Sequence, residues 1–411
     1  MSSRTYDIVL LGATGYTGKF TAEYIQEHAR TNLKWAIAGR NGQRLESIAA
    51  ELKTLNADRV QPAIEVVSLD AAELDALAKK TTVLISTVGP YWKFGSPVVE
   101  ACAKNGTHYL DVTGEVPWVY EMLQKYHETA KANGSFIIPQ CGIDSVPADL
   151  LAWLLVRHVR KTLNTGVREV VNSLQKISGA ISGGTATTAI SLIEAYPLKV
   201  LRKSMHPFAL CPIPAPPKFS PGGILSKLLG YRTVPDLGVL TTSPQAGSDI
   251  PIVNRSWGLF DNGALYGPNF RFSEYMRTRN AFTGALTAYA FGLLMLGLVF
   301  KPIRSLLKRL AYAPGEGQTK EEAKHNVLRY KATAVADAQP ARRAVATFDY
   351  TGPGYYLTGV MLAEAALEVL DGGDFYARKI GGGMVTPATL GEGYVERLRK
   401  AGCKIEVDML D

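Results

Sequence analysis

Cysteine and histidine are scarce in this chain of 411 residues, which has four cysteines and six histidines. The cysteines are scattered and no two of them have the spacing of metal ligands; they are Cys102, Cys141, Cys211 and Cys403. We therefore expect buried, reduced thiols and no metal site. The dispersed histidines form no Ser-His-Asp arrangement, so nothing indicates a hydrolytic triad.

Strong charge and a targeting segment are also missing. The net charge of +8 is modest for this length, and basic residues are not interleaved with aromatic ones, which argues against a nucleic-acid partner. The polar N-terminus, Met1–Asp7, leads directly into an apolar strand, without the features of a secretory signal or transit peptide. We expect two domains and a protein that is not secreted and faces the cytosol.

A glycine-rich turn near the N-terminus carries the clearest signal. An apolar strand runs into glycines at positions 12, 15 and 18 and then into a helix expected over 16–29. This pattern is typical of the first βα turn of a dinucleotide-binding domain. Gly12 permits the tight turn, Gly15 lets the backbone approach a pyrophosphate, and Gly18 lets the helix pack closely on the strand. Because the helix N-terminus also attracts phosphate, the expected contacts include Thr14, Tyr16 and Thr17. The alternative is a structural turn without a ligand.

The end of the second expected strand indicates which dinucleotide is bound. A site for NAD usually has Asp or Glu there, bonded to the ribose 2′-hydroxyl. This chain has Arg40, with Arg44 one helical turn further on. A guanidinium suits a 2′-phosphate, so we expect NADP(H) rather than NAD(H). An ordinary solvated arginine is the alternative.

Residues 1–150 alternate strand and helix patterns, as an α/β, Rossmann-type doubly wound parallel sheet requires. Ligands of such sheets bind beyond the carboxyl ends of the strands. Those ends supply the remaining expected cofactor contacts: Asp70 as a helix cap near the adenine, then Val88, Gly89, Pro90, Asp111, Thr113 and Gly114. For Asp111 the alternative is that it only braces its loop. Candidate proton donors follow the same strands. Tyr91 comes first, with an aromatic lid or packing role as its alternative. Asp144 and Ser145 come next, although Asp144 could equally cap the helix entered at Pro147.

The rest of the chain is expected to form a second, α+β domain. Residues 151–350 are assigned to a substrate or cap domain. It contains a strand over 167–177, a helix opened by Ser182–Thr188, and an irregular Pro/Gly-rich insertion over 206–255. Residues 351–411 are expected to form C-terminal helices that pack back on the nucleotide domain, with a turn at 381–387.

An uncharged apolar run, Ala281–Phe300, is followed by an amphipathic basic stretch, so that the candidate membrane segment is 281–312. As one helix the run would be roughly 30 Å long, about the hydrocarbon thickness of a bilayer. Cationic residues flank both ends; they are Arg277, Arg279, Lys301, Arg304, Lys308 and Arg309. We expect a segment that lies on one leaflet of a membrane or lipid droplet, with the basic stretch at the headgroups. A buried core helix, an interface of a homo-oligomer and a true span are the alternatives.

Several of these motifs together resemble those of the saccharopine dehydrogenase-like oxidoreductases. The resemblance rests on the glycine turn, Ala38–Arg40, Val88–Tyr91, Tyr109–Glu115, Gly142–Pro147, Ser182–Thr185 and Leu362–Ala366. The branch that looks most similar contains trans-acting enoyl reductases of bacterial glycolipid synthesis and animal lipid-droplet-associated members. The resemblance implies an NADP(H)-binding domain covered by an α+β domain, and hydride transfer to a lipid-like or polyketide-type enoyl or carbonyl substrate.

Two other classes of function fit the same sequence. The chain could be a non-catalytic NADP(H) sensor, because no catalytic acid is secure, or a membrane-surface scaffold with a vestigial nucleotide fold. The sequence leaves open the substrate, the direction of the reaction and the oligomeric state.

Overall fold

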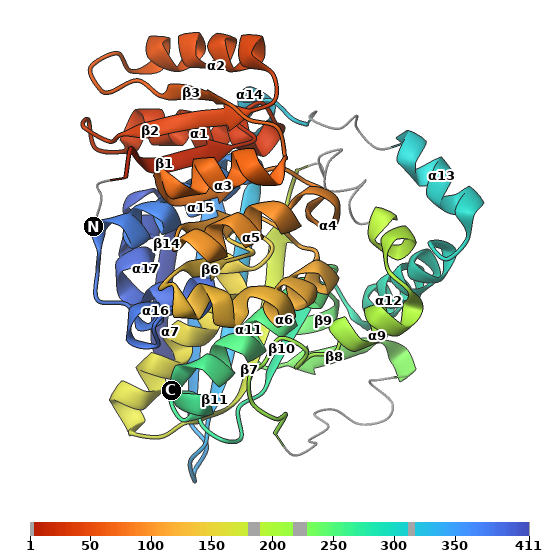
Figure 1. Cartoon of the computed structure of the whole chain (residues 1–411). Coiled ribbons are helices and arrows are strands. Elements are labelled where there is room, and N and C mark those ends of the chain that lie inside the picture. Colours follow the sequence, from red (N-terminus) through yellow and green to blue (C-terminus); the bar gives the residue numbers. More distant parts are fainter. Residues whose placement is uncertain (1–3, 180–189, 217–227, 311–316, 411) are drawn as a thin grey trace.

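The computed structural model describes residues 4–179, 190–216, 228–310 and 317–410. The expected helix start at Ser182–Thr188 therefore lies outside the described residues. Two seven-stranded sheets organise the chain, and helices lie between and around them (Figure 1).

The first sheet is wholly parallel and has the order β13-β6-β5-β4-β1-β2-β3. Its strands are β1 (Tyr6–Leu11), β2 (Trp35–Gly39), β3 (Ala63–Val66), β4 (Thr81–Ser86), β5 (His108–Asp111), β6 (Phe136–Ile138) and β13 (Gly383–Met384). The helices between them are α1 (Tyr16–His28), α2 (Gly42–Leu55), α3 (Ala71–Lys79), α4 (Tyr91–Phe94), α5 (Ser96–Asn105) and α6 (Val116–Ala132). The predicted Rossmann-type α/β fold is confirmed. The pairing of β13 with β6 was not predicted.

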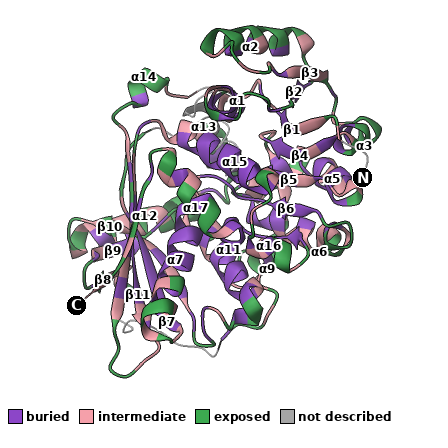
Figure 2. Cartoon of the chain, turned by 90° about the vertical axis from the view of Figure 1, so that its left-hand side faces the viewer, coloured by how far each residue is buried: buried purple, intermediate pink, exposed green. Residues whose placement is uncertain are grey.

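Both faces of this sheet are buried, which explains its continuous apolar strands. Along β1, Ile8 and Leu10 belong to one core cluster, whereas Val9 and Leu11 belong to a second cluster on the opposite face. In Figure 2 the central strands of this sheet are largely purple and lie between helices, whereas the edge strand β3 is pink and green. The carboxyl edge of the sheet is therefore held rigidly, and the loops that leave it start from fixed positions.

The second sheet is mixed and has the order β14-β12-β11-β7-β10-β9-β8. Only β7 and β10 run parallel. Its strands are β7 (Val167–Ile177), β8 (Tyr231–Val234), β9 (Gly238–Thr242), β10 (Phe272–Thr278), β11 (Val327–Ala336), β12 (Arg343–Thr351) and β14 (Lys404–Leu410). Two long helices, α7 (Val146–Leu163) and α11 (Ala246–Leu259), pack against it, and the 3-10 turn η1 (Phe260–Gly263) follows. Because α7 begins directly after the β6 loop, it connects the cofactor edge of the first sheet to the second sheet.

The prediction of an irregular insertion over 206–255 is wrong for much of the described part of this range. It contains β8, β9 and most of α11. The last of these is a core helix, since Ile252 and Val253 are fully buried. A proline lies inside this helix at Pro251, and such a residue normally indicates a break. Tertiary burial outweighs the local cost here.

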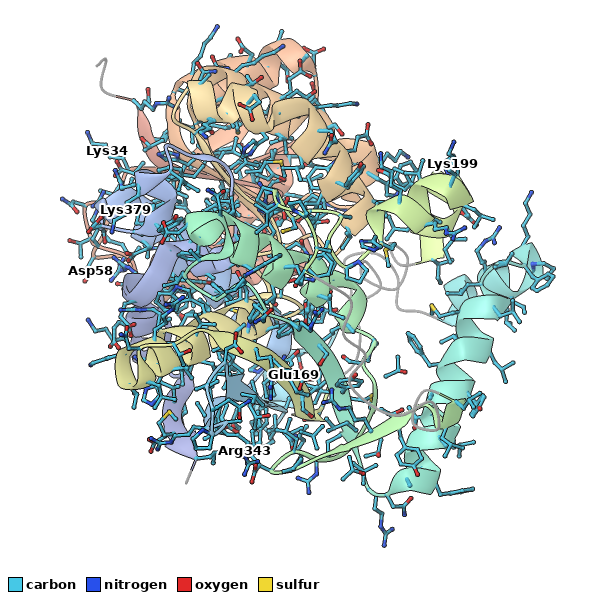
Figure 3. The ribbon with its side chains drawn as sticks, turned by 90° about the horizontal axis from the view of Figure 1, so that it is seen from below. Lys34, Asp58, Glu169, Lys199, Arg343 and Lys379 are labelled. Carbon is cyan, nitrogen blue, oxygen red and sulfur yellow. The ribbon has the colours of Figure 1, made fainter. Side chains whose placement is uncertain are left out.

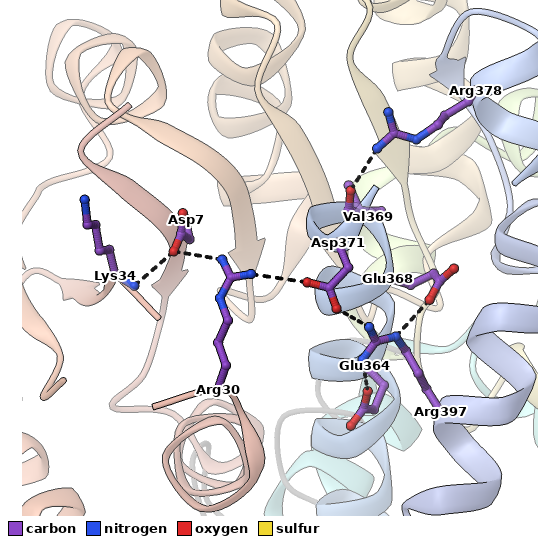
Figure 4. Close-up of polar contacts among 9 residues, drawn as sticks. All are labelled: Asp7, Arg30, Lys34, Glu364, Glu368, Val369, Asp371, Arg378 and Arg397. Atoms are coloured by element: carbon purple, nitrogen blue, oxygen red, sulfur yellow. Dashed lines mark hydrogen bonds and ion pairs between the residues drawn. The ribbon is translucent and has the colours of Figure 1, made fainter. Parts of the chain in front are cut away.

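The C-terminal segment contributes one strand to each sheet, β13 to the first and β14 to the second. Its helices are α15 (Gly354–Asp371), α16 (Tyr376–Lys379) and α17 (Gly391–Lys400), with the 3-10 turn η2 (Pro387–Leu390) before α17. The first of them packs on α1, where a Cβ at Gly359 would lie 2.9 Å from the backbone nitrogen of Thr21. The close-up in Figure 4 shows Arg30 pairing with Asp7 at 3.1 Å and with Asp371 at 3.3 Å. These half-exposed ion pairs orient the helices more than they stabilise them.

The apolar run is not one straight helix. It forms α12 (Ala281–Gly297), which turns by 111° into α13 (Lys301–Leu310). Among the described residues no single helix is both long and apolar enough to cross a bilayer, and only this bent pair reaches that length and composition together. The expectation of Arg304 at the headgroups is wrong. Arg304 is 7% exposed, and it donates to the carbonyls of Leu298 (2.7 Å) and Val299 (2.8 Å), which fixes the bend.

A buried core helix was one alternative for the apolar run, and the structure contradicts it. Only Gly284 of α12 is buried, whereas Phe282 is 76% exposed and Leu293 is 69% exposed.

Two shorter helices complete the described fold; they are α9 (Leu198–Ser204) and α14 (Lys320–Ala323). In Figures 1 and 3, α12 and α13 stand at one side of the molecule, beside α9, which carries Lys199.

Candidate active site

The glycine turn has the close contacts that its sequence predicts. Gly12 has a φ of +96°, a conformation that favours glycine. A Cβ on Gly18 would lie 2.2 Å from the carbonyl oxygen of Gly12 and 2.8 Å from Oγ1 of Thr87. The turn therefore brings strand, loop and helix closer together than any side chain allows, and leaves the start of α1 open at the sheet edge.

Thr87 was missed from the sequence, although it directly follows the apolar fourth strand. Its Oγ1 donates to the carbonyl of Gly12 at 3.1 Å and ties the end of β4 to the glycine turn. No side chain caps α1 at Gly15, so the first N–H groups of the helix remain available to a phosphate. Thr14 and Thr17 are half-buried at this edge. The side chain of Tyr16 is held by another part of the chain, because its hydroxyl donates to the carbonyl of Gln318.

Arg40 and Arg44 are exposed beside the end of β2, where a 2′-phosphate is expected. The intervening Asn41 caps α2, because its Oδ1 accepts the N–H of Arg44 at 3.1 Å. That cap fixes the start of α2. It uses the backbone N–H of Arg44 and neither of the two guanidinium groups. Asp70 caps α3 through Ala72 N–H at 2.9 Å, which confirms its predicted capping role. Its contact with the adenine stays a prediction.

Tyr91 is a packing residue in this structure. Its ring lies 5.5 Å from that of Trp118, and it is 6% exposed. Its hydroxyl donates to the carbonyl of Ser86 at 3.0 Å and accepts from the N–H of Val112 at 3.4 Å. Burial, the largest cause, raises the pKa of this phenol well above its ordinary value. The geometry therefore disfavours Tyr91 as the first proton donor, because its hydroxyl already donates one hydrogen bond and accepts another within the chain.

Glu115 organises the loop between β4 and α4. Its two carboxylate oxygens accept the N–H groups of Tyr91 and Trp92, each at 2.7 Å. The loop before Tyr91, which contains Val88, Gly89 and Pro90, reaches the surface at Gly89. Burial raises the pKa of Glu115 to about 7. A carboxylate in this position holds the cofactor loop and is not free to contact a ligand.

Asp111 has a similar bracing role and is fully buried, so it is not accessible to a cofactor. It accepts from Tyr109 Oη at 2.9 Å, from Thr113 N–H at 2.9 Å and from Gln140 N–H at 3.0 Å. Burial raises its pKa to about 6. The direct contact expected of Asp111 is thus disfavoured, whereas Gly114 next to it is exposed and open.

Asp144 lies in the β6–α7 loop and is only half-buried. The alternative that it caps α7 is not what the structure has. The cap position is Ser145, and no side chain caps the helix. Instead Asp144 Oδ1 accepts from Gln245 Nε2 at 2.9 Å, and Gln245 Oε1 accepts from Tyr330 Oη at 2.5 Å. Burial raises the pKa of Asp144. Ser145 is 1% exposed, and its Oγ accepts from Gln140 Nε2 at 3.2 Å.

The residues from the first sheet fit a bound dinucleotide. Two glycine positions exclude any side chain, the helix start is uncapped, and two exposed arginines lie at the end of β2. Such an arrangement would hold a pyrophosphate at Gly12–Gly18 and a 2′-phosphate at Arg40. The nicotinamide would then lie toward the ends of β5 and β6, where Asp144 meets Gln245 of the second domain.

Comparison with known proteins agrees with this geometry. Residues 8–138 match the family model of the saccharopine dehydrogenase NADP binding domain. A trans-acting enoyl reductase of Mycobacterium ulcerans (strain Agy99) is 31% identical over 429 residues, which cover 100% of this chain and 99% of that protein. A trans-acting enoyl reductase of Mycobacterium tuberculosis (strain H37Rv) is 32% identical over 421 residues, covering 98% and 97%.

The fold also matches that of apo saccharopine dehydrogenase (L-Glu forming) from Saccharomyces cerevisiae. The TM-score is 0.56 at 12% identity, and the match covers 98% of this chain and 99% of that one. With relatives this similar over nearly its full length, the chain belongs to the saccharopine dehydrogenase-like family of NADP(H)-dependent oxidoreductases.

Proposed function

We propose that this protein transfers a hydride from NADPH to a lipid-like substrate, at an enoyl double bond or a carbonyl group. The observation that carries the proposal is the position of Asp144. Asp144 follows β6 at the carboxyl edge of the first sheet, and Gln245 of the second domain donates a hydrogen bond to it at 2.9 Å. A reduction by hydride needs a proton at the neighbouring atom, and a carboxyl with a raised pKa is suited to supply it.

When bound, NADPH supplies the hydride. The side chains of the protein hold the cofactor in place and give a proton to the substrate. Gly12–Gly18 and Arg40 hold the phosphates, Glu115 fixes the loop after β4, and Asp144 gives a proton to the substrate. Tyr91 and Ser145 support the fold of these loops in this account. The named relatives favour an enoyl substrate over a carbonyl one.

The test is NADPH oxidation with trans-2-enoyl thioesters of increasing chain length, and with matched ketones as a second series. We expect turnover with long enoyl chains and its loss in Asp144→Asn, with NADPH affinity retained. Tight NADPH binding without turnover on either series would favour the sensor. Absence of NADPH binding would favour the scaffold. Either result contradicts the proposal.

We also propose that α12 and α13 attach the protein to the surface of a membrane or lipid droplet. Large apolar side chains on both helices are exposed, including Leu286 (60%), Leu293 (69%) and Leu306 (57%), and Lys301 is exposed at the bend. A bent pair with an apolar first arm and an exposed lysine at the bend is suited to one leaflet, with Lys301 at the headgroups.

Sedimentation with vesicles of phosphatidylcholine and phosphatidylglycerol tests this attachment. Wild type is expected to bind, the double variant Leu286→Glu, Leu293→Glu to remain in solution, and Leu55→Glu, an exposed leucine on α2, to bind as wild type. If the double variant instead dissociates an oligomer and wild type ignores the vesicles, α12 is an interface between copies of the chain.

A further inference from the structure

A pocket with a basic lining lies between α6 and α9. Its volume is about 490 Å³, and its lining residues are Tyr120, Lys199, Arg202, Lys203, His206 and Ala209. Lys199, Arg202 and Lys203 are three and four residues apart in α9, so they share one face of the helix, and His206 follows just after its end. All four basic residues are exposed. The proposed reduction uses none of them.

The positive charges of this pocket are not neutralised within the described chain. No Asp or Glu among the described residues forms an ion pair with Lys199, Arg202 or Lys203. Glu121 of α6 pairs instead with Lys125, at 2.6 Å. Lys199 and Lys203 are one helical turn apart, and like charges at this spacing destabilise a helix. A bound anion would offset their repulsion.

The side chains of the pocket offer the donors that a phosphate group needs. Arg202 can bind two phosphate oxygens with one guanidinium, and the two lysines add point charges. His206 Nδ1 accepts the N–H of Phe208 at 3.2 Å, so the neutral ring has its hydrogen on Nε2 and can donate it to a ligand. The ammonium of Lys203 lies 5.4 Å from the ring centroid of Tyr120.

This set of donors matches a phosphomonoester better than a phosphodiester. A phosphomonoester has a charge of about −1.5 to −2 near neutral pH and three strong acceptor oxygens. A phosphodiester has a single negative charge, which would leave the other cations of the pocket without a partner. The chemistry of the pocket therefore favours a terminal phosphate group.

The surroundings of the pocket indicate that this phosphate belongs to a lipid. Leu198 of α9 is 71% exposed, and Met205 at the end of the helix is 47% exposed. Figures 1 and 3 show α9 on the same side of the molecule as α12 and α13, and the ion pair Arg304–Glu194, at 2.9 Å, joins α13 to the helical turn before α9. Cations beside exposed apolar side chains are typical of segments that lie on an anionic lipid surface. A soluble phosphate would leave these apolar side chains in water.

We propose that the pocket between α6 and α9 binds the phosphomonoester headgroup of an anionic lipid, with Lys199, Arg202 and Lys203 on its oxygens. This inference rests on the proposed attachment of α12 and α13, and it names the lipid at which the attachment occurs. The exposed apolar side chains supply affinity for any lipid surface. The pocket selects surfaces that display a phosphomonoester.

Sedimentation with two sets of phosphatidylcholine vesicles tests this selectivity. One set contains phosphatidic acid, and the other contains phosphatidylglycerol at equal surface charge. Wild type is expected to bind the phosphatidic acid vesicles more tightly. The double variant Lys199→Gln, Lys203→Gln should bind them about 25-fold more weakly and lose the preference, because each lysine near an anionic surface contributes about fivefold.

The matched control is the double variant Lys34→Gln, Lys379→Gln. It makes the same change of charge at exposed positions on the opposite side of the molecule from Lys199 (Figure 3), and it should bind as wild type. Equal binding by wild type and the pocket variant, or equal losses in the pocket variant and the control, would overturn the proposal.

A soluble probe separates the pocket from the attachment. Dihexanoyl phosphatidic acid below its micelle concentration is titrated by calorimetry into wild type and into Leu286→Glu, Leu293→Glu. We expect binding to both proteins and its loss in the pocket variant, even if α12 and α13 attach to no vesicle. The failure of the attachment and the failure of the pocket are thus distinguishable.

Inorganic phosphate is the second soluble probe, and it should bind more weakly than the short-chain lipid. Equal affinity for the two would assign the pocket to a soluble phosphate and overturn the proposal. Binding of wild type to neither phosphatidic acid vesicles nor the short-chain lipid would also overturn it, and would favour an acidic protein as the partner of α9.

Discussion

Ser256 donates a hydrogen bond of 2.5 Å from Oγ to Oδ1 of Asp149, which joins α11 to α7 in the buried layer beside the site. The second oxygen of Asp149 accepts the N–H of Ala388 at 2.8 Å, so that η2 is tied to the same carboxyl. Three segments far apart in the sequence thus meet at one acid. Burial, the largest cause, raises its pKa from 3.8 to about 7.

This relationship predicts how the stability of the protein depends on pH. Because the pKa of Asp149 is higher in the folded state, its contribution to the free energy of unfolding is fully present below about pH 4 and is lost as the pH rises through about 7. Asp149→Asn removes this dependence. Relative to the variant, wild type should lose up to about 4 kcal/mol between pH 4 and pH 8. Urea unfolding at a series of pH values measures the difference, and a constant gap would contradict the prediction.

Gly18→Ala should weaken NADPH binding by about a hundredfold or more, about 3 kcal/mol. The added Cβ would lie 2.2 Å from the carbonyl oxygen of Gly12, so that the turn must open and the helix start must move. Gly292→Ala is the matched control, because a Cβ there meets nothing within 4 Å and Gly292 lies in α12, outside the glycine turn. Fluorescence titration with NADPH measures both variants. Equal affinities in the two folded variants would show that the turn is not the phosphate site.

Arg40→Ala should reduce affinity for NADPH about tenfold or more and leave affinity for NADH nearly unchanged, because we expect the guanidinium to contact the 2′-phosphate, which NADH lacks. Arg44→Ala is expected to act in the same direction with a smaller effect. Titration of each variant with both nucleotides gives the ratio, in which NADH serves as the internal control. A parallel loss for both nucleotides would place Arg40 in a general structural role.

The first sheet could be predicted largely from sequence, because its apolar strands alternate with amphipathic helices. The strand predicted over 167–177 also agrees with β7. Strand ends located Tyr91 and Asp111 correctly at the carboxyl edge, but no pattern tells whether a polar side chain there faces the ligand or braces a loop. Both turned inward, to partners that only the folded chain supplies.

Several strands of the second sheet and the core helix α11 were missed for physical reasons. In β10 the inward positions include Glu274, so the alternation of apolar and polar residues that indicates a strand is broken. In α11 the residues Gly247, Pro251 and Gly258 made a core helix look like a loop. Gln245, at the start of this helix, therefore had no predicted partner.

The central claim is hydride transfer to a lipid-like acceptor, and isotope transfer tests it most directly. The protein is incubated with NADPH deuterated at both C4 positions and with a long-chain trans-2-enoyl thioester, and the product is analysed by mass spectrometry. The account predicts a saturated product that carries one deuterium from the nicotinamide and a second new hydrogen from water. A protein that binds NADPH but transfers no deuterium, to this acceptor or to the matched ketone, would contradict it.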